Sequence, residues 1–423
     1  MTAQIQGRPA GARIDSLDVL RGFAILGILV MNIQAFSMVT VQYVNPTLAG
    51  PMMGLDLWLW LIAHVGFENK FIAIFSALFG AGIVLMAERA ELSGAAVWGR
   101  HLRRMFVLGL FGLGHAYLIW YGDILFIYAV IGSIAFLFRN LSLRGLLTLA
   151  GLVYLFPLAF AVAMTVAFLA MPQVYYDALV TQYWQPTSPE IAGQEAAYRG
   201  GWSEQMGQRV SDAMTLHLGL LPLKDGWRVL ALMLAGMAAY RSGLLTGDWS
   251  ERRYARTGLL GLAIGLPLAL GGVWFHFATG WEMATSLFLG AAFNHLAAPF
   301  IALAWGCGLL IVFNRGWLAW LLERFRAVGR TALTCYLLTS VICTSIFYGH
   351  GLGLFGQVTR GEQWLIMLGV WVLLIAFATL WLRWFRQGPV EWLWRVGVYG
   401  GAALRPRRRG PPTDPPTAGS GTH

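Results

Sequence analysis

The stretch GHAYLIWYGDIL, residues 114–125, places a histidine and an aspartate in a strongly apolar part of the chain. His115 and Asp123 are eight positions apart, so a tight turn between them would let the two side chains meet. An imidazole titrates near neutral pH and can remove a proton from a hydroxyl group, while a carboxylate can orient it and stabilise the imidazolium ion. The pair therefore indicates a general base with its orienting carboxylate. The alternative interpretation is a hydrogen bond that only locks two neighbouring helices together.

The composition identifies the surroundings of this pair as a membrane. Of the 423 residues, 57% are hydrophobic and only 12% are charged, which a water-soluble domain of this size would not carry on its surface. Apolar runs long enough to cross about 30 Å of hydrocarbon recur along most of the chain. The three cysteines, Cys307, Cys335 and Cys343, lie in apolar runs without metal-ligand spacing, so the sequence predicts no disulfide framework and no metal site.

The apolar runs predict an all-α fold, a polytopic transmembrane bundle of about ten spans. We expect the spanning helices at residues 17–39, 69–87, 105–121, 123–139, 144–171, 226–243, 257–277, 284–313, 331–349 and 363–384. Two further amphipathic segments, 54–66 and 210–222, are too short or too polar to span, and their composition is typical of helices in the interface.

The basic residues give the expected orientation. The net charge of +10 comes from arginines in short loops between apolar runs, which are signals of topology rather than of nucleic-acid binding. They occur at every second helix boundary, which predicts that both termini are cytoplasmic. We expect a cytoplasmic N-terminal segment at 1–16, one membrane domain at 17–400 and a disordered basic cytoplasmic tail at 401–423.

This orientation predicts two polar levels. Asn32, about 16 Å along its helix from Arg21, is expected at the outer level with His115 and Asp123. Intramembrane Asn also commonly joins helices by hydrogen bonds, so Asn32 has a purely structural interpretation as well. The cytoplasmic level is expected to hold Arg21, Arg103, Arg104 and Arg330, most of which the positive-inside rule alone would explain.

Several strings, in order along nearly the whole chain, resemble the YeiB family of bacterial membrane proteins, described as a domain of unknown function, DUF418. They are SLDVLRGFAILGILVMNIQAF (16–36), KFIAIFSALFGAGIVL (70–85), GHAYLIWYGDILFIYAVIG (114–132), RSGLL (241–245), GRTALTCYLLTSVICTSIFYGHGLGLFG (329–356) and WFRQGPVEWLWR (384–395).

The first string also resembles a wider group. Its pattern L-D-x-x-R-G is similar to the opening helix of transmembrane acyltransferases, such as heparan-alpha-glucosaminide N-acetyltransferase and the enzymes that decorate bacterial surface glycans. That resemblance implies an acyl donor such as acetyl-CoA, bound from the cytoplasm through basic residues, and an external histidine that assists transfer. Arg21 matches the motif arginine. Asn32 stands where the glycan-decorating enzymes carry a histidine and the heparan enzyme an asparagine, and Tyr43 stands where the heparan enzyme has its histidine.

His115 is therefore expected to take the place of the relatives' base. The leading hypothesis is transfer of an acyl group from a cytoplasmic acyl-CoA to an extracytoplasmic glycan, lipid or small molecule. In it His115 is the base, Asp123 its orienting group and Asn32 an oxyanion donor. Arg21, Arg103, Arg104 and Arg330 would contact the donor phosphates, with no metal. The alternatives are a transporter of a small solute and a non-catalytic membrane partner. The lipid bilayer is the one expected partner besides the acceptor, a homo-oligomer stays open, and no nucleic acid is expected.

Overall fold

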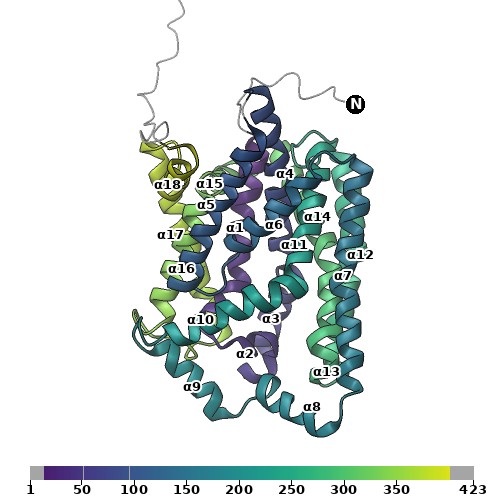
Figure 1. The fold of residues 1–423 in the computed structure, drawn as a ribbon, viewed down its shortest axis with the longest axis vertical. Helices are drawn as coiled ribbons and strands as arrows, with labels where there is room; N and C mark the ends of the chain where they lie inside the picture. The colour runs from purple at the N-terminus through teal and green to yellow at the C-terminus, as the bar shows by residue number, and fades with distance from the viewer. Residues whose placement is uncertain (1–13, 51, 95, 401–423) are drawn as a thin grey trace, which may run out of the picture.

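The computed structural model describes residues 14–400 except 51 and 95, and within this part the regular elements are helices, with no β-strand (Figure 1). The expected tail at 401–423 and most of the expected N-terminal segment lie outside the described residues. The α-helices are α1 Asp15–Ser37, α2 Thr40–Val44, α3 Gly54–Gly66, α4 Lys70–Leu92, α5 Val97–Leu118, α6 Leu125–Ala135, α7 Leu143–Leu169, α8 Gln173–Leu179, α9 Ser188–Arg199, α10 Met206–Met214, α11 Gly226–Arg241, α12 Glu251–Ala278, α13 Met283–Thr285, α14 Ala291–Asn314, α15 Ala319–Arg330, α16 Ala332–Phe347, α17 Arg360–Trp384 and α18 Pro389–Tyr399.

Short irregular helices join or extend these elements. Two are 3-10 turns, Pro46–Ala49 and Phe136–Phe138, and three are π-helical stretches, Val180–Trp184, Thr215–Asp225 and Ser286–Gly290. Each of the ten apolar runs expected to be helical contains a helix. The largest shift is at 105–121, where α5 begins earlier, at Val97. At 284–313, α14 begins only at Ala291, after a π-helical stretch.

Six segments among the described residues are long and apolar enough to cross a membrane. They are Asp15–Ser37, Gly54–Leu92, Leu143–Leu169, Glu251–Ala278, Met283–Asn314 and Arg360–Trp384. α15 and α16 pass the same test together but meet at an angle of 87°, which makes them a broken span or a re-entrant pair. The all-helical class and the apolar membrane helices are thus confirmed, whereas the count of about ten spans and the cytoplasmic termini stay predictions.

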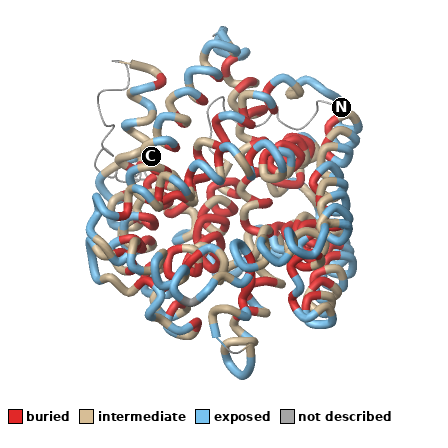
Figure 2. The backbone as a smooth tube through the Cα atoms, turned by 60° about the horizontal axis from the view of Figure 1, so that its bottom comes forward, coloured by how far each residue is buried: buried red, intermediate tan, exposed pale blue. Residues whose placement is uncertain are grey.

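Burial separates a central helix from an outer layer. In α1, 72% of the apolar window is buried, against 17% in α7 and 28% in each of α12 and α17. Buried segments lie mostly inside the bundle, and exposed segments lie around its outside (Figure 2). The outer helices expose large apolar side chains, such as Leu152, Leu259 and Leu365. A helix that is apolar on its outer face as well is typical of contact with lipid. The core of the protein therefore lies around α1, and the outer helices face the bilayer.

Contacts between distant segments define one end of the bundle, which we call the arginine end. Arg326 of α15 pairs with Asp15 at the start of α1 at 3.3 Å, and Arg103 of α5 donates to the carbonyl of Gly397 in α18 at 3.1 Å. Figure 1 shows this end at the top, with α15 and α18, and the opposite end at the bottom, with α8 and α9. The start of α5 and the end of α15 thus meet α18 and the N-terminal end of α1.

The crossing of α1 and α15 depends on two glycines. A Cβ atom on Gly22 would lie 1.8 Å from the carbonyl oxygen of Phe325, and one on Gly329 would lie 1.8 Å from that of Asp18. Small residues let helix backbones approach this closely in membrane proteins. The L-D-x-x-R-G string at the start of α1 is therefore held directly against the last turns of α15, which also carries Arg330.

Candidate active site

The hairpin between α5 and α6 brings His115 and Asp123 together. α5 ends at Leu118, and the carbonyl of His115 accepts the N–H groups of both Ile119 and Trp120, which close its last turn. Asp123 then caps the next helix, because its Oδ2 accepts the N–H of Phe126 at 2.7 Å. A backbone turn closed in this way leaves the second oxygen of Asp123 facing α5.

The three side chains of Asp123, His115 and Ser340 form one hydrogen-bonded line. Nδ1 of His115 lies 2.9 Å from Oδ1 of Asp123, and Nε2 lies 2.8 Å from Oγ of Ser340 in α16. The side chains of His115 and Asp123 are fully buried, and Ser340 is 1% exposed. Because an ionised carboxylate only accepts, a neutral His115 donates through Nδ1 to Asp123 and accepts at Nε2 from the Ser340 hydroxyl. We call these three residues the relay.

Aromatic side chains enclose the relay. The ring of Tyr336, one turn before Ser340 on α16, lies 5.1 Å from that of His115, and its hydroxyl accepts the N–H of Ile124 at 3.2 Å. Trp120 packs edge-on to His115 at 6.2 Å and stacks on Phe36 of α1 at 3.9 Å. Its indole N–H is buried and has no hydrogen-bond partner among the described residues. The relay therefore has a free donor in its immediate surroundings.

Asn32 is the third member of the constellation expected at the outer level. It lies half-buried on α1, one turn before Phe36. Within the described part of the chain, no hydrogen bond joins Asn32 to His115 or Asp123. Ser340 instead occupies the position beside Nε2 of His115.

Two short helices, α9 and α10, cover the end of α5 that carries the relay. We call residues 188–214 the cap. Trp202 and Arg209 both donate to the carbonyl of Leu118 at 3.0 Å, and Arg209 is completely buried. The ring of Tyr198 lies 6.3 Å from that of Tyr121 in the α5–α6 connection. The cap therefore covers the end of α5 near the relay, and this end points away from the arginine end.

Within the cap, Tyr198 and Asp212 form a further buried pair. The hydroxyl of Tyr198 donates to the carboxyl group of Asp212, and burial raises the pKa of both groups above their ordinary values. A carboxyl group that binds its proton more tightly in this way reduces the charge buried against the aromatic rings of the cap. The pair joins α9 to α10 and so helps to hold the cap closed.

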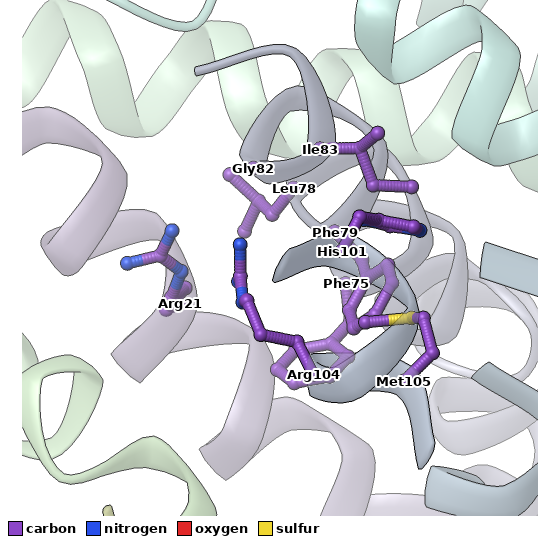
Figure 3. A pocket seen from close by; sticks show the side chains of 9 residues that line it. All are labelled: Arg21, Phe75, Leu78, Phe79, Gly82, Ile83, His101, Arg104 and Met105. Carbon is purple, nitrogen blue, oxygen red and sulfur yellow. The ribbon is translucent and has the colours of Figure 1, made fainter. Parts of the chain in front are cut away.

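Two of the four expected donor-binding arginines share a pocket at the arginine end. Arg21 of α1 and Arg104 of α5 line a pocket of about 120 Å³ together with His101 and apolar side chains of α4 and α5 (Figure 3). Arg21 also contacts Asp18 at 3.0 Å, and the guanidinium of Arg104 lies 5.2 Å from the ring centre of Trp394 in α18. The pocket is therefore basic on one side and apolar on the other.

The other two arginines lie at the same end but outside that lining. Arg103 is directed to the carbonyl of Gly397, as described above. Arg330 lines a second pocket, of about 230 Å³, between α15 and α17. Its other charged lining residues are Glu323, Arg324, Arg326 and Arg383. The four expected arginines are thus divided between two pockets and a helix contact.

A second buried polar group lies at the break between α3 and α4. Its residues are not among the site residues expected from the sequence. Lys70 is completely buried and donates to the carbonyl of His64 at 2.8 Å and to the side chain of Asn294 in α14. Glu68 accepts from Asn294 at 3.1 Å and pairs with His64. We call these four residues the break cluster. The charged string FENK between two apolar runs was its signal in the sequence.

Neither polar group has the composition of a metal centre. Among the described residues, no group of three or more His, Cys, Asp or Glu side chains is arranged to hold a metal ion. The donors and acceptors of the relay match the pattern of a proton-transfer chain, with carboxylate, imidazole and hydroxyl in sequence.

The chain is similar to proteins of one family along nearly its whole length. The family model described as "Protein of unknown function (DUF418)" matches residues 239–401. The chain is 35% identical over 388 residues to uncharacterized protein YeiB of Escherichia coli (strain K12), which covers 90% of this chain and 94% of that protein. It is 33% identical over 417 residues to uncharacterized protein YxaH of Bacillus subtilis (strain 168), which covers 94% and 97% of the two chains. Because these similarities extend over almost the entire length of each chain, the protein belongs to the DUF418 family that includes YeiB.

Proposed function

We propose that this protein transfers an acyl group across the membrane, from a cytoplasmic acyl-CoA to an extracytoplasmic glycan, lipid or small-molecule acceptor. The observation that carries the proposal is the buried hydrogen-bonded line from Asp123 through His115 to Ser340. An imidazole whose Nδ1 is held by a carboxylate presents a basic Nε2, which is the arrangement that acyl transfer to a hydroxyl or amine requires.

In this reaction His115 removes the proton of the attacking group at Nε2, and Asp123 stabilises the imidazolium ion that forms. The indole N–H of Trp120 is buried beside His115 without a partner, so it can donate a hydrogen bond to the developing oxyanion. Asn32, half-buried one turn from the Phe36 that stacks on Trp120, stays the second proposed donor. The pocket at Arg21 and Arg104 is the proposed site for donor phosphates, because guanidinium groups bind phosphate oxygens in pairs. Arg103 and Arg330 remain more remote candidates for the same role.

The two sites are joined by a single helix. Arg104 and His115 are eleven residues apart on α5, which is about 16 Å along the helix axis. A donor with its phosphates at Arg104 would therefore need a long, narrow arm to bring its acyl group to the relay. The pantetheine arm of CoA thioesters has this form, which supports an acyl-CoA over a compact acyl donor. The positive-inside rule supports a cytoplasmic arginine end, where such a donor would enter.

The proposal can be tested in everted membrane vesicles, which expose the cytoplasmic face and contain the natural acceptors. Vesicles with the wild-type protein are expected to transfer radiolabel from [14C]acetyl-CoA to the lipid or glycan fraction. His115→Ala is expected to lose this transfer, while His295→Ala, at a buried histidine that stacks on Tyr154 in another part of the bundle, is expected to keep it. Transfer at the wild-type rate by the His115→Ala protein would overturn the proposed role of the relay.

Transport of a small solute is the second candidate, and the break cluster favours it. Buried charges at an interrupted helix are typical of binding sites in transporters, and Lys70 and Glu68 lie at the interruption between α3 and α4. A transporter would move solute in proteoliposomes without any acyl donor, and Lys70→Gln would abolish that uptake. Acyl transfer that continues in the Lys70→Gln protein would assign the two activities to different groups.

A further inference from the structure

We propose that Ser340 is the nucleophile of the acyl transfer and carries the acyl group as an ester between two half-reactions. This inference rests on the proposed function and deepens it, because it changes the reaction from direct transfer to transfer through the protein. Ser340 becomes a catalytic residue, and His115 becomes the base for both steps.

The hydroxyl of Ser340 is hydrogen-bonded to a side chain of another helix. A serine or threonine inside such a helix commonly bonds back to the carbonyl four residues earlier. Thr339 and Ser345 of the same helix do so, with distances of 2.7 Å to the carbonyls of Cys335 and Val341. The hydroxyl of Ser340 instead bonds to an imidazole 225 positions away in the sequence. The fold has directed this hydroxyl to a base.

The other members of the relay complete the geometry of an activated nucleophile. Nε2 of His115 is 2.8 Å from Oγ of Ser340, within range for proton transfer, and its far side is fixed by Asp123 at 2.9 Å. Asp123 is itself fixed by the N–H of Phe126. The orientation of the imidazole is thus determined from α6 and the nucleophile is supplied from α16, so both groups stand on rigid elements.

A hydrogen-bond donor without a partner lies next to the relay. Trp120 is 2% exposed, and its indole N–H has no partner among the described residues. A buried donor without a partner costs stability, roughly 1–3 kcal/mol, and usually has a functional explanation. A tetrahedral oxyanion formed next to His115 would be such a partner.

The chemistry balances in two steps. In the first, Oγ of Ser340 attacks the thioester carbonyl, its proton passes to Nε2 of His115, and the C–S bond breaks as the CoA thiolate leaves and takes that proton. In the second, the hydroxyl or amine of the acceptor attacks the seryl ester, its proton passes to Nε2, the ester C–O bond breaks, and Ser340 recovers its proton. The net products are free CoA and the acylated acceptor.

A covalent intermediate also fits the two-sided architecture. The basic pocket lies at the arginine end, whereas the cap lies over the opposite end of α5. In two half-reactions the donor can leave before the acceptor enters, so the relay never needs to be open to both ends at once. Direct transfer would require both substrates to reach one buried imidazole together.

The test is to trap the ester in the purified full-length protein without an acceptor. After incubation with acetyl-CoA and acid denaturation, peptide mass spectrometry of the wild-type protein is expected to show one acetyl group on Ser340. Ser340→Ala is expected to lose both this label and the transfer in vesicles. Ser340→Cys is expected to carry a thioester that neutral hydroxylamine removes. Ser345→Ala, which changes an exposed serine of the same helix that bonds only to its own backbone, is expected to match the wild type.

The possible failures are distinguishable. Undiminished label transfer in vesicles by a folded Ser340→Ala protein, or transfer by the wild type with no acetyl group on Ser340, would overturn the covalent step and leave direct attack by the acceptor. Absence of both CoA release and label transfer from the wild-type protein would overturn the acyl-transfer proposal itself. Thermal unfolding of each variant in detergent establishes that it is folded.

Discussion

His115 and Ser340 are 225 positions apart in the chain, yet Nε2 of one lies 2.8 Å from Oγ of the other. This contact joins α5 to α16, two helices that belong to opposite halves of the sequence. The carboxylate that orients the imidazole comes from a local turn, while the hydroxyl comes from a distant helix. The relay thus forms only when α16 packs against the hairpin of α5 and α6.

Replacement of Asp123 by asparagine tests the orienting role. An amide can donate to Nδ1, which would place the imidazole proton on Nε2 and leave no base facing Ser340. We expect the rate of label transfer at saturating acetyl-CoA to fall by roughly 10⁴-fold, as it does when the orienting carboxylate of a Ser-His-Asp triad is replaced by asparagine. Asp177→Asn, on the exposed surface of α8, is the matched control. A rate within twofold of the wild type would show that Asp123 does not act through His115.

Replacement of Gly112 by alanine tests the packing of the α5–α6 hairpin. A Cβ at this position would lie 2.3 Å from the backbone nitrogen of Phe126 and 2.9 Å from Oδ2 of Asp123, so the two helices would have to separate. Overpacking of this kind costs about 1–3 kcal/mol. We expect a lower thermal unfolding temperature in detergent and loss of label transfer. Gly114→Ala, two residues later with open space around its Cβ, is expected to unfold at or above the wild-type temperature.

Replacement of Arg104 by alanine tests the proposed donor pocket. Loss of a charged hydrogen bond to a phosphate of about 1.5–3 kcal/mol corresponds to an increase in the KM for acetyl-CoA of roughly tenfold or more. The kcat is expected to change much less, because the pocket is remote from the relay. Arg144→Ala, an exposed arginine at the start of α7, provides the control for net charge. Equal KM values in the two variants would remove this pocket from the proposal.

Replacement of Glu391 tests how α18 is attached at the arginine end. Its carboxyl group accepts the N–H groups of Leu333 and Thr334 at 2.7 and 3.1 Å and the hydroxyl of Thr334 at 2.5 Å, and so caps the start of α16. Glu391→Ala is expected to lower the free energy of unfolding by about 1–3 kcal/mol. Glu391→Gln keeps a carbonyl acceptor and is expected to lose less.

The pH dependence of stability is also expected to differ between the wild-type protein and Glu391→Gln. Burial raises the pKa of Glu391 above its ordinary value of 4.5, so the folded state favours the protonated form. The stability that this protonation contributes is complete below pH 4.5 and is lost as the pH rises through the raised pKa of the folded state. Unfolding temperatures measured across this range should fall for the wild type relative to Glu391→Gln. Parallel curves would show that folding does not raise the pKa of Glu391.

The local part of the relay could be predicted from the sequence, but the distant part could not. His115 and Asp123 are close in the chain, so a tight turn was enough to bring them together, and they meet at 2.9 Å. Ser340 lies in an apolar run, and nothing local shows that its helix packs against α5. The spacing of Tyr336, Ser340 and Thr344, four residues apart and all buried, was the available signal, since it places polar atoms on one face of an apolar helix.

The arginines show the same limit. Arg21, Arg104 and Arg330 could be assigned to one end of the bundle from the pattern of charge alone, and they do lie at the arginine end. Their division between two pockets depends on the crossing of α1 and α15 at Gly22 and Gly329, and on the sharp turn after α15. Backbone crossings of this kind follow from three-dimensional packing and leave little trace in hydropathy.

The bend between α15 and α16 has a consequence for the bilayer itself. α16 has 16 residues and is therefore about 24 Å long, whereas a typical hydrocarbon layer is about 30 Å thick. With α15 turned through 87°, a lipid layer next to this helix pair would have to thin, or water would have to enter at its ends. Ser340, near the middle of α16, would then be separated from each aqueous phase by about 12 Å, against about 15 Å at the centre of a normal hydrocarbon layer. A transferred group would therefore cross a thinner hydrocarbon layer here than elsewhere in the membrane.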